Sequence, residues 1–189
     1  MKVQKHCDER RSGLIIGSRP SRDGLPRKLD HALNVLFLCE KNAELSIMAE
    51  SILQSAGKDR FGSFSAGCAP AKAVNPSVVE FLAAHHLPVS GLRPKGLDAF
   101  RSPDAPRIDF IITVCDAAAA EDFSDWLGAP FIARWCIEDE PQAPRSDAAL
   151  RDAFWVLLRR IKIFTSLPHG KLTRRRLEHR ARVLETGYH

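Results

Sequence analysis

The chain has 189 residues, 44% hydrophobic residues and a net charge of +5, values typical of one soluble globular domain. No apolar run approaches the ~20 residues that a membrane-spanning helix needs, and the first residues lack the apolar core of a secretory signal. Five cysteines without a C-x-x-C pair argue against a secreted disulfide framework and against a zinc site. We therefore expect a cytoplasmic protein without metal, cofactor or membrane contact.

The first predicted elements follow a flexible basic arm over residues 1–32, which has little periodicity. The continuous apolar run at 34–38 is typical of a strand buried on both faces. A helix is expected over 46–56, and a second strand at 60–65. Asn75-Pro76 then predicts the start of another helix, because proline favours the first helical position.

Two further strands are predicted in the second half of the chain, a strongly buried one at 109–114 and a shorter one at 130–135. Asp147 is expected to cap a long amphipathic helix, because apolar residues recur at helical spacing from Leu150 to Ile161. A last helix, over 173–185, is strongly basic.

Strands that alternate with helices predict an α/β fold with three layers, in which a four-stranded parallel sheet is flanked by helices. This domain would span residues 33–168 and be followed by a basic C-terminal helix over 169–189. Ligands bind such sheets at the carboxyl ends of the strands, where the sequence places both Cys39 and Cys115.

The segment Val35–Glu50 reads V-L-F-L-C-E-K-N-A-E-L-S-I-M-A-E and predicts a strand, a cysteine, a tight polar loop and a helix. A helix N-terminus favours a nearby thiolate and attracts phosphate-like anions, so Cys39 is placed to be a thiolate beside a bound oxyanion. The predicted anion-binding loop consists of Glu40, Lys41, Asn42, Ala43, Glu44, Leu45 and Ser46.

This loop resembles the phosphate-binding loop of the low-molecular-weight protein tyrosine phosphatase superfamily. It is most similar to the thioredoxin-coupled arsenate reductase branch, which reads V-L-F-L-C-x-x-N-x-x-R-S-x-M-A-E. Three further stretches match in order: F-S-A-G-C-A-P-A-K-A-V-N-P at 64–76, I-I-T-V-C-D at 111–116 and G-A-P-F-I-A-R-W-C-I-E-D at 128–139. The resemblance covers about 34–141 and implies the phosphatase-like fold.

The resemblance also implies roles for individual residues. Cys39 would be the nucleophile, Asn42 would fix the strained loop, and Ser46 would stabilise the thiolate. Asp139 would protonate the leaving group. Leu45 occupies the position of the arginine that grips two oxygens of the oxyanion, and leucine supplies neither charge nor hydrogen bonds.

The charges of the loop weaken anion binding further, because Glu40 and Glu44 outnumber Lys41. Losing a buried charge partner costs roughly 2–5 kcal/mol, so we expect efficient turnover to be lost. Arg134 is the candidate substitute cation, since its predicted strand ends near the site. The alternative is that Arg134 is a surface residue without a role in the site.

The reductase relay is incomplete in this sequence. In that branch, oxidation passes from the loop cysteine to a second cysteine and then to a third, seven residues later. Cys115 matches the second cysteine, whereas Asp122 occupies the third position. Cys68 and Cys136 are alternative positions for the third thiol. A Cys39–Cys115 disulfide alone would make a redox switch or a glutaredoxin-type cycle.

Structural explanations compete with these roles. Leu45 falls at helical spacing with Met48 and Ile52 and is favoured as part of the core stripe of the helix. Cys39 is either an activated thiol or an inert buried residue, and Cys115 is more often a packing residue at a strand end. Asp139 lies in an acidic run that is also typical of a solvated loop.

Three functional hypotheses follow. The leading one is a catalytically impaired family member that binds a ligand or partner, or senses redox state through Cys39. The second is an active arsenate reductase or tyrosine phosphatase with a substitute cation such as Arg134. The third is an interaction module whose basic C-terminal helix binds an acidic protein or nucleic acid. The implied partners are an oxyanion such as phosphate or arsenate, a phosphoprotein, and a thioredoxin or glutaredoxin system.

Overall fold

A computed structural model describes residues 32–137, 145–166 and 173–185. Its sheet has four strands: β1 (Leu33–Cys39), β2 (Phe61–Gly67), β3 (Phe110–Thr113) and β4 (Phe131–Arg134). They are all parallel and lie in the order β2-β1-β3-β4. The α/β fold with a four-stranded parallel sheet is therefore confirmed. The predicted arm lies outside the described residues, apart from residue 32.

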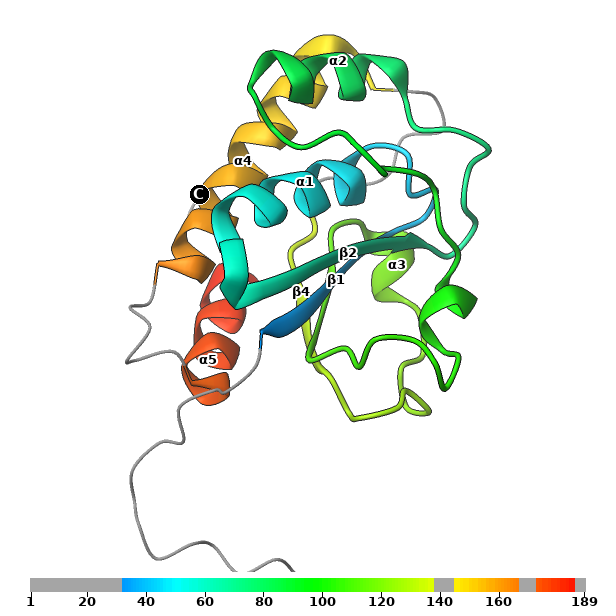
Figure 1. Cartoon of the computed structure of the whole chain (residues 1–189), viewed down its shortest axis with the longest axis vertical. Coiled ribbons are helices and arrows are strands. Elements are labelled where there is room, and N and C mark those ends of the chain that lie inside the picture. The colour runs from blue at the N-terminus through cyan, green and yellow to red at the C-terminus, as the bar shows by residue number, and fades with distance from the viewer. Residues whose placement is uncertain (1–31, 138–144, 167–172, 186–189) are drawn as a thin grey trace, which may run out of the picture.

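The helices are α1 (Leu45–Gly57), α2 (Pro76–Ala84), α3 (Asp116–Ala119), α4 (Asp147–Thr165) and α5 (Arg174–Glu185), with short 3-10 turns η1 (Lys58–Arg60) and η2 (Leu97–Phe100). Helices α1 and α4 pack together on one side of the sheet, and α3 lies on the other side (Figure 1). No helix among the described ranges is both long enough and apolar enough to cross a membrane.

The structure confirms the predicted burial of β1 and the predicted start of α2, and it corrects the predicted cap of α4. Strand β1 is almost completely buried, as its continuous apolar run predicts. Helix α2 starts at Pro76, and the side chain of Asn75 caps it by accepting a hydrogen bond from the Ser77 N–H. Helix α4 is capped by Ser146 and not by Asp147, because the Ser146 hydroxyl is the group that accepts the Ala149 N–H.

Helix α5 packs against β4, which is an edge strand of the sheet. Leu177, Ala181 and Leu184 are buried on this side of the helix. The indole N–H of Trp135 donates to the Ala181 carbonyl at 3.1 Å. The backbone N–H of Arg134 donates to the Glu185 carboxylate at 2.8 Å. The helix therefore covers apolar surface and also satisfies polar groups at the edge of the sheet.

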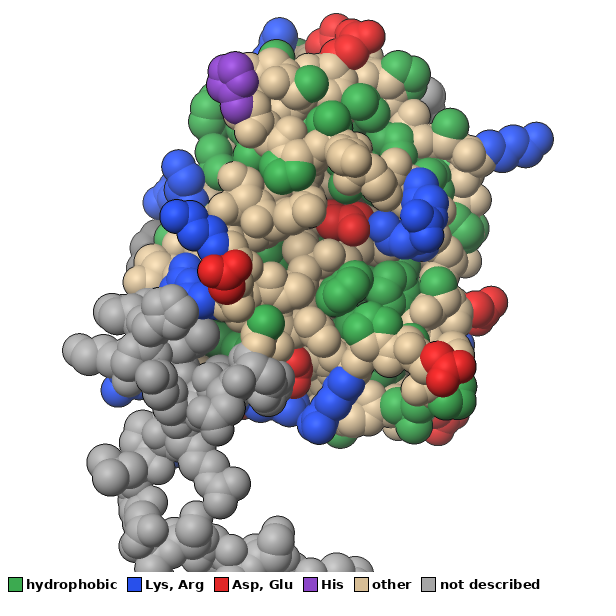
Figure 2. All heavy atoms as spheres, in the orientation of Figure 1, with side chains coloured by type: hydrophobic (Ala, Val, Ile, Leu, Met, Phe, Trp, Pro, Cys, Tyr) green, Lys and Arg blue, Asp and Glu red, His purple; other side chains and the backbone are tan. Residues whose placement is uncertain are grey.

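Charge on the surface is mixed. On the face that Figure 2 shows, basic and acidic side chains are scattered among hydrophobic and uncharged atoms. Several arginines of α5 are engaged within the molecule. Arg174 pairs with Glu178 and also donates to the Ala129 carbonyl, while Arg180 donates to the Ile163 carbonyl. Part of the basic character of the helix therefore stabilises its own docking.

Candidate functional site

The site is built where β1 ends and α1 begins. Cys39 is the last residue of β1, and its Sγ lies 2.8 Å from the hydroxyl of Ser46, the second residue of α1. The backbone N–H of Asn42 donates to the same sulfur at 3.1 Å. Both contacts suit a thiolate, which accepts hydrogen bonds. The structure thus brings together Cys39, Asn42 and Ser46, as the sequence predicted.

The peptide groups of the loop point in a consistent direction. Its carbonyl oxygens accept hydrogen bonds of 2.8–3.2 Å from a neighbouring segment, in the donor–acceptor pairs Cys68–Cys39, Ala69–Glu40, Ala71–Lys41 and Asn75–Ala43. Because N–H and C=O point in opposite directions in a trans peptide, the following N–H groups turn away from that segment. The Asn42 N–H shows the direction, since it faces the sulfur. Convergent N–H groups of this kind form an anion-binding concavity.

Gly67, the last residue of β2, lets this packing occur. A Cβ atom at position 67 would lie 2.6 Å from the Glu40 carbonyl oxygen and 2.9 Å from the Asn42 nitrogen. Both atoms belong to the backbone of the loop, so neither can move aside without deforming it. The close approach of strand and loop therefore requires glycine here.

Asn42 fixes the loop from inside. Its φ of +48° is in the left-handed region, which asparagine tolerates better than most residues. The amide nitrogen donates to the hydroxyls of Ser46 and Ser65, both at 2.8 Å. The amide oxygen accepts the backbone N–H of Lys95 at 2.7 Å. Because the amide nitrogen and the amide oxygen both have partners and the side chain is fully buried, Asn42 locks the conformation of the loop.

The ion pair between Lys95 and Glu50 extends the hydrogen-bond network of Asn42. Ser65 donates its hydroxyl to the Glu50 carboxylate. Lys95 Nζ lies 2.9 and 3.1 Å from the two oxygens of that carboxylate. Ser65 and Glu50 lie within stretches that carry the resemblance, but no motif signals a role for either of them. Lys95 lies outside these stretches, so only the folded chain reveals it.

Leu45 is a core residue. It is the first residue of α1, it is 1% exposed, and it shares the hydrophobic core with Met48 and Ile52. The prediction that it extends the apolar stripe of the helix is confirmed. At the position where the resemblance implies an arginine, the side chain adds apolar packing to the core.

Arg145 contacts Glu44, a residue of the loop. Arg145 NH1 is 3.1 Å from one carboxylate oxygen of Glu44, and Asn75 donates to the other at 2.8 Å. Arg145 is 101 residues from Glu44 and belongs to no motif, so the sequence alone does not single it out. Arg134, the predicted substitute cation, ends β4 with an exposed side chain. Asp139, the predicted acid, lies outside the described residues.

Four cysteines lie at the end of the sheet where its parallel strands have their carboxyl ends. Each strand has a cysteine at its carboxyl end or within two residues after it. In the sheet order β2-β1-β3-β4 these are Cys68, Cys39, Cys115 and Cys136. Among the described residues, none of the four forms a disulfide. Cys39, at the end of β1, and Cys115, just after the adjacent strand β3, are buried, whereas Cys68 and Cys136 are partly exposed. Within the described ranges, no three metal-ligating side chains come together.

The two outer thiols are held protonated. Burial raises the pKa of Cys68 to about 12, with help from a hydrogen bond to Glu121 and from that residue's charge. Burial also raises the pKa of Cys136 to about 11, together with a hydrogen bond to Asp116. Asp122, at the third position of the relay, has a lowered pKa because Ser124 donates hydrogen bonds to it.

Cys68 should therefore alkylate slowly. At pH 8 a pKa of about 12 leaves roughly a thousandfold less thiolate than an ordinary thiol has, and the stronger nucleophilicity of a basic thiolate offsets only part of this. We expect iodoacetamide to react roughly 30- to 50-fold more slowly than with a free thiol. The rate should rise with pH, because only the thiolate reacts. Glu121→Gln should accelerate it, and peptide mass spectrometry would measure both. Reaction at the rate of a free thiol would contradict the assignment.

The comparisons with known proteins agree with this geometry. The family model described as low molecular weight phosphotyrosine protein phosphatase matches residues 34–125. A thioredoxin-dependent arsenate reductase of Corynebacterium glutamicum has 24% identity and a TM-score of 0.55, with 70% of this chain and 60% of that chain covered. The chain thus spans less than two thirds of that reductase.

Two further structures are similar over nearly their whole length. An arsenate reductase from Archaeoglobus fulgidus has 26% identity and a TM-score of 0.56, with 70% of this chain and 99% of that chain covered. A low molecular weight protein tyrosine phosphatase from T. tengcongensis has 21% identity and a TM-score of 0.57, with 72% and 100% covered. No curated protein matches the chain in sequence.

Proposed function

Starting from this similarity to the low molecular weight phosphatases and arsenate reductases, we propose that the chain is an oxyanion-binding thiol protein in which catalytic turnover is impaired. The observation that carries the proposal is the burial of Leu45 in the core, at the position where the resemblance implies an arginine. A bidentate, permanently charged donor stabilises the transition state for transfer of a phosphoryl or arsenyl group, so its absence lowers that stabilisation.

Ligand binding is the activity that the remaining features support. The convergent N–H groups of the loop and the N-terminus of α1 suit a phosphate or arsenate ion, or the phosphate group of a phosphoprotein. The hydrogen bonds from Ser46 and Asn42 suit Cys39 as a reactive thiolate that oxidation would block. In this proposal Cys115, which follows the adjacent strand β3, is the partner for a disulfide that a thioredoxin or glutaredoxin would reduce in the cytoplasm.

The second candidate is an active arsenate reductase or tyrosine phosphatase. It is favoured by the contacts among Cys39, Ser46 and Asn42, to which a cation would have to be added. In this version Cys39 is the nucleophile, Asp139 the acid and Arg134 the substitute cation. Arg134→Ala would then abolish turnover in a folded protein, whereas an unchanged rate would remove Arg134 from the mechanism.

One comparison tests the leading proposal. Under reducing conditions we expect wild-type hydrolysis of an aryl phosphate and reduction of arsenate to stay within about tenfold of Cys39→Ser, because the arginine contribution is missing. Inorganic phosphate should nevertheless slow the alkylation of Cys39, since it occupies the same loop. Turnover a hundredfold above Cys39→Ser would reject impairment. Alkylation that is insensitive to phosphate would reject oxyanion binding.

A further inference from the structure

We propose that the outer faces of α4 and α5 form a docking surface for an acidic segment of another protein, which anchors one apolar side chain between the two helices. The inference goes beyond the proposed function and does not depend on it. It is carried by the charge of the two helices, by the large hydrophobic side chains that they expose, and by an apolar pocket where they meet.

The two helices hold the whole net charge of the chain. Together α4 and α5 have nine arginines and lysines against four acidic residues, which equals the net charge of +5 of all 189 residues. The remainder of the chain is therefore balanced. A surface region of one sign attracts partners of the opposite sign and raises their rate of encounter. An acidic partner would thus be directed toward these helices.

Basic side chains form a stripe on the outside of α4. Arg151, Arg159 and Lys162 are exposed, and their spacing places them on one face of the helix together with the exposed Trp155. Asp152, which follows Arg151, is the exposed acidic residue next to this stripe. The stripe therefore keeps an excess of positive charge around an aromatic side chain.

Exposed hydrophobic side chains gather on the same two helices. Five large hydrophobic side chains are exposed in the described ranges, and three of them, Trp155, Val156 and Val183, belong to α4 and α5. Trp155 is 53% exposed. Tryptophan and arginine are the residues that contribute most often to the binding energy of protein–protein interfaces. The composition of this surface therefore fits a protein partner.

An apolar pocket lies where the two helices meet. Val156 and Ile163 of α4 and Leu184 of α5 line it, beside Arg159 and Arg160, and its volume is about 80 Å³. Aliphatic walls next to guanidinium groups suit an aliphatic side chain whose neighbours in the sequence are carboxylates. A nucleic acid suits the pocket less well, because its affinity comes mainly from phosphates and its bases have polar edges.

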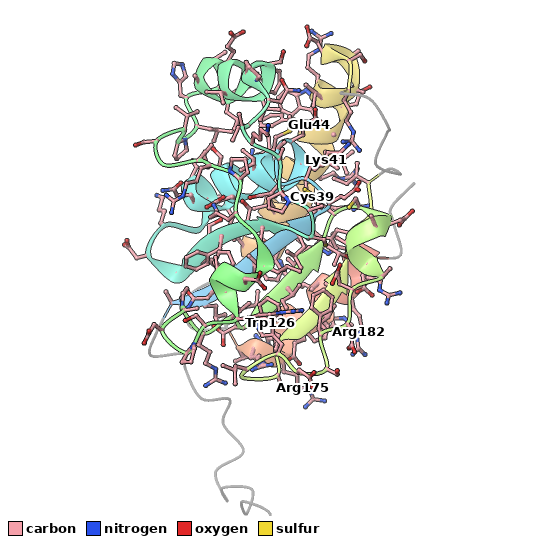
Figure 3. The ribbon with its side chains drawn as sticks, turned by 90° about the vertical axis from the view of Figure 1, so that its right-hand side faces the viewer. Cys39, Lys41, Glu44, Trp126, Arg175 and Arg182 are labelled. Atoms are coloured by element: carbon pink, nitrogen blue, oxygen red, sulfur yellow. The ribbon has the colours of Figure 1, made fainter. Side chains whose placement is uncertain are left out.

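The surface is held together and lies apart from the oxyanion loop. Arg180 of α5 donates to the Ile163 carbonyl, and the two helices contact each other on one side of the molecule (Figure 1). Figure 3 shows Arg175 and Arg182 of α5 in the lower half of the molecule and Cys39 in the upper half. A partner anchored at the pocket should therefore leave phosphate binding at the loop unchanged.

The probe is a fluorescent peptide in which one leucine is flanked on both sides by glutamates. Its binding to the full chain is measured by fluorescence anisotropy, against a matched peptide with alanine in place of leucine and against a single-stranded oligonucleotide. We expect the leucine peptide to bind about tenfold more tightly than the alanine peptide, because leucine buries more apolar area. Its affinity should fall as salt is added, because salt screens the charges.

Two changes in the protein test charge and pocket separately. Arg159→Glu with Lys162→Glu should weaken binding of the leucine peptide about tenfold or more. The same reversal at the exposed Lys72 and Arg93, outside α4 and α5, should weaken it less than about threefold. Val156→Lys adds a positive charge but removes an apolar wall of the pocket, so it should weaken binding about fivefold. A partner recognised by charge alone would bind Val156→Lys more tightly.

Several outcomes would overturn the proposal. Equal affinity for the leucine and alanine peptides, or tighter binding to Val156→Lys, would exclude an apolar anchor. Equal losses in the two charge-reversed proteins would indicate attraction by net charge alone. An oligonucleotide that binds more tightly than the leucine peptide would assign the surface to nucleic acid. Phosphate protection of Cys39 is measured in the same proteins, so a failure here is distinguishable from a failure of oxyanion binding, and urea melts identify variants that have lost stability.

Discussion

Leu45→Arg should gain Cys39-dependent hydrolysis of an aryl phosphate, about 30- to several-thousand-fold above the wild-type rate. This range corresponds to roughly 2–5 kcal/mol, the contribution of a buried charge partner. The substitution places a bidentate donor at the first residue of α1, next in the chain to Ser46, whose hydroxyl contacts Cys39. Steady-state kinetics in this variant and in its Cys39→Ser counterpart would measure the gain.

The gain comes with a loss of stability. Leu45 is 1% exposed, and removing it from the core costs about 1.5–3 kcal/mol while the arginine turns toward the loop. Two matched variants control for this. Leu45→Met preserves apolar packing and should gain no activity, and Leu45→Lys adds charge without the planar fork and should gain less than arginine. A folded Leu45→Arg protein without any gain would show that the site lacks more than its arginine.

Ending the chain at residue 172, which removes α5, should lower the free energy of unfolding by about 4–7 kcal/mol. Truncation exposes the core positions that Leu177, Ala181 and Leu184 cover, and it removes the acceptor of the Trp135 indole N–H. A loss of this size is comparable with the whole stability of many domains. Urea denaturation of the truncated and full-length chains would measure it.

This result bears on the hypothesis of an interaction module, because deleting the helix would disturb the fold as well as any partner. Arg175→Glu combined with Arg176→Glu is the appropriate control, since both side chains are exposed and lie away from the buried face. The double variant should keep the stability of the full chain and lose only contacts with an acidic partner. An unchanged stability after truncation would mean that α5 is a separate appendage.

Local signals in the sequence predict what local forces decide. The apolar run of β1, the Asn75-Pro76 start of α2 and the helical spacing of Leu45 with Met48 each fix one element or one buried position. The cap of α4 was misassigned by one residue, because Ser146 and Asp147 are both good capping residues. Only the hydrogen-bond geometry distinguishes them.

The charge environment of the loop could not be predicted in this way. Lys95 meets Glu50 across 45 residues, and Arg145 meets Glu44 across 101. Neither spacing follows a helical or strand period, and each contact depends on how connecting segments cross the end of the sheet. The sequence therefore gives the charges of the loop and its helix, but not which distant side chains contact them.

The outward hydrogen bonds of the loop carbonyls, with Asn42 locked inside, have a thermodynamic consequence. The conformational entropy of this segment is lost when the domain folds, so a ligand finds the donors already ordered and has little further entropy to remove. Affinity then depends mainly on the charge near the loop, because the backbone donors are already in place. Changes at Gly67 would act in the opposite way, since they disturb the preformed shape while leaving the charge untouched.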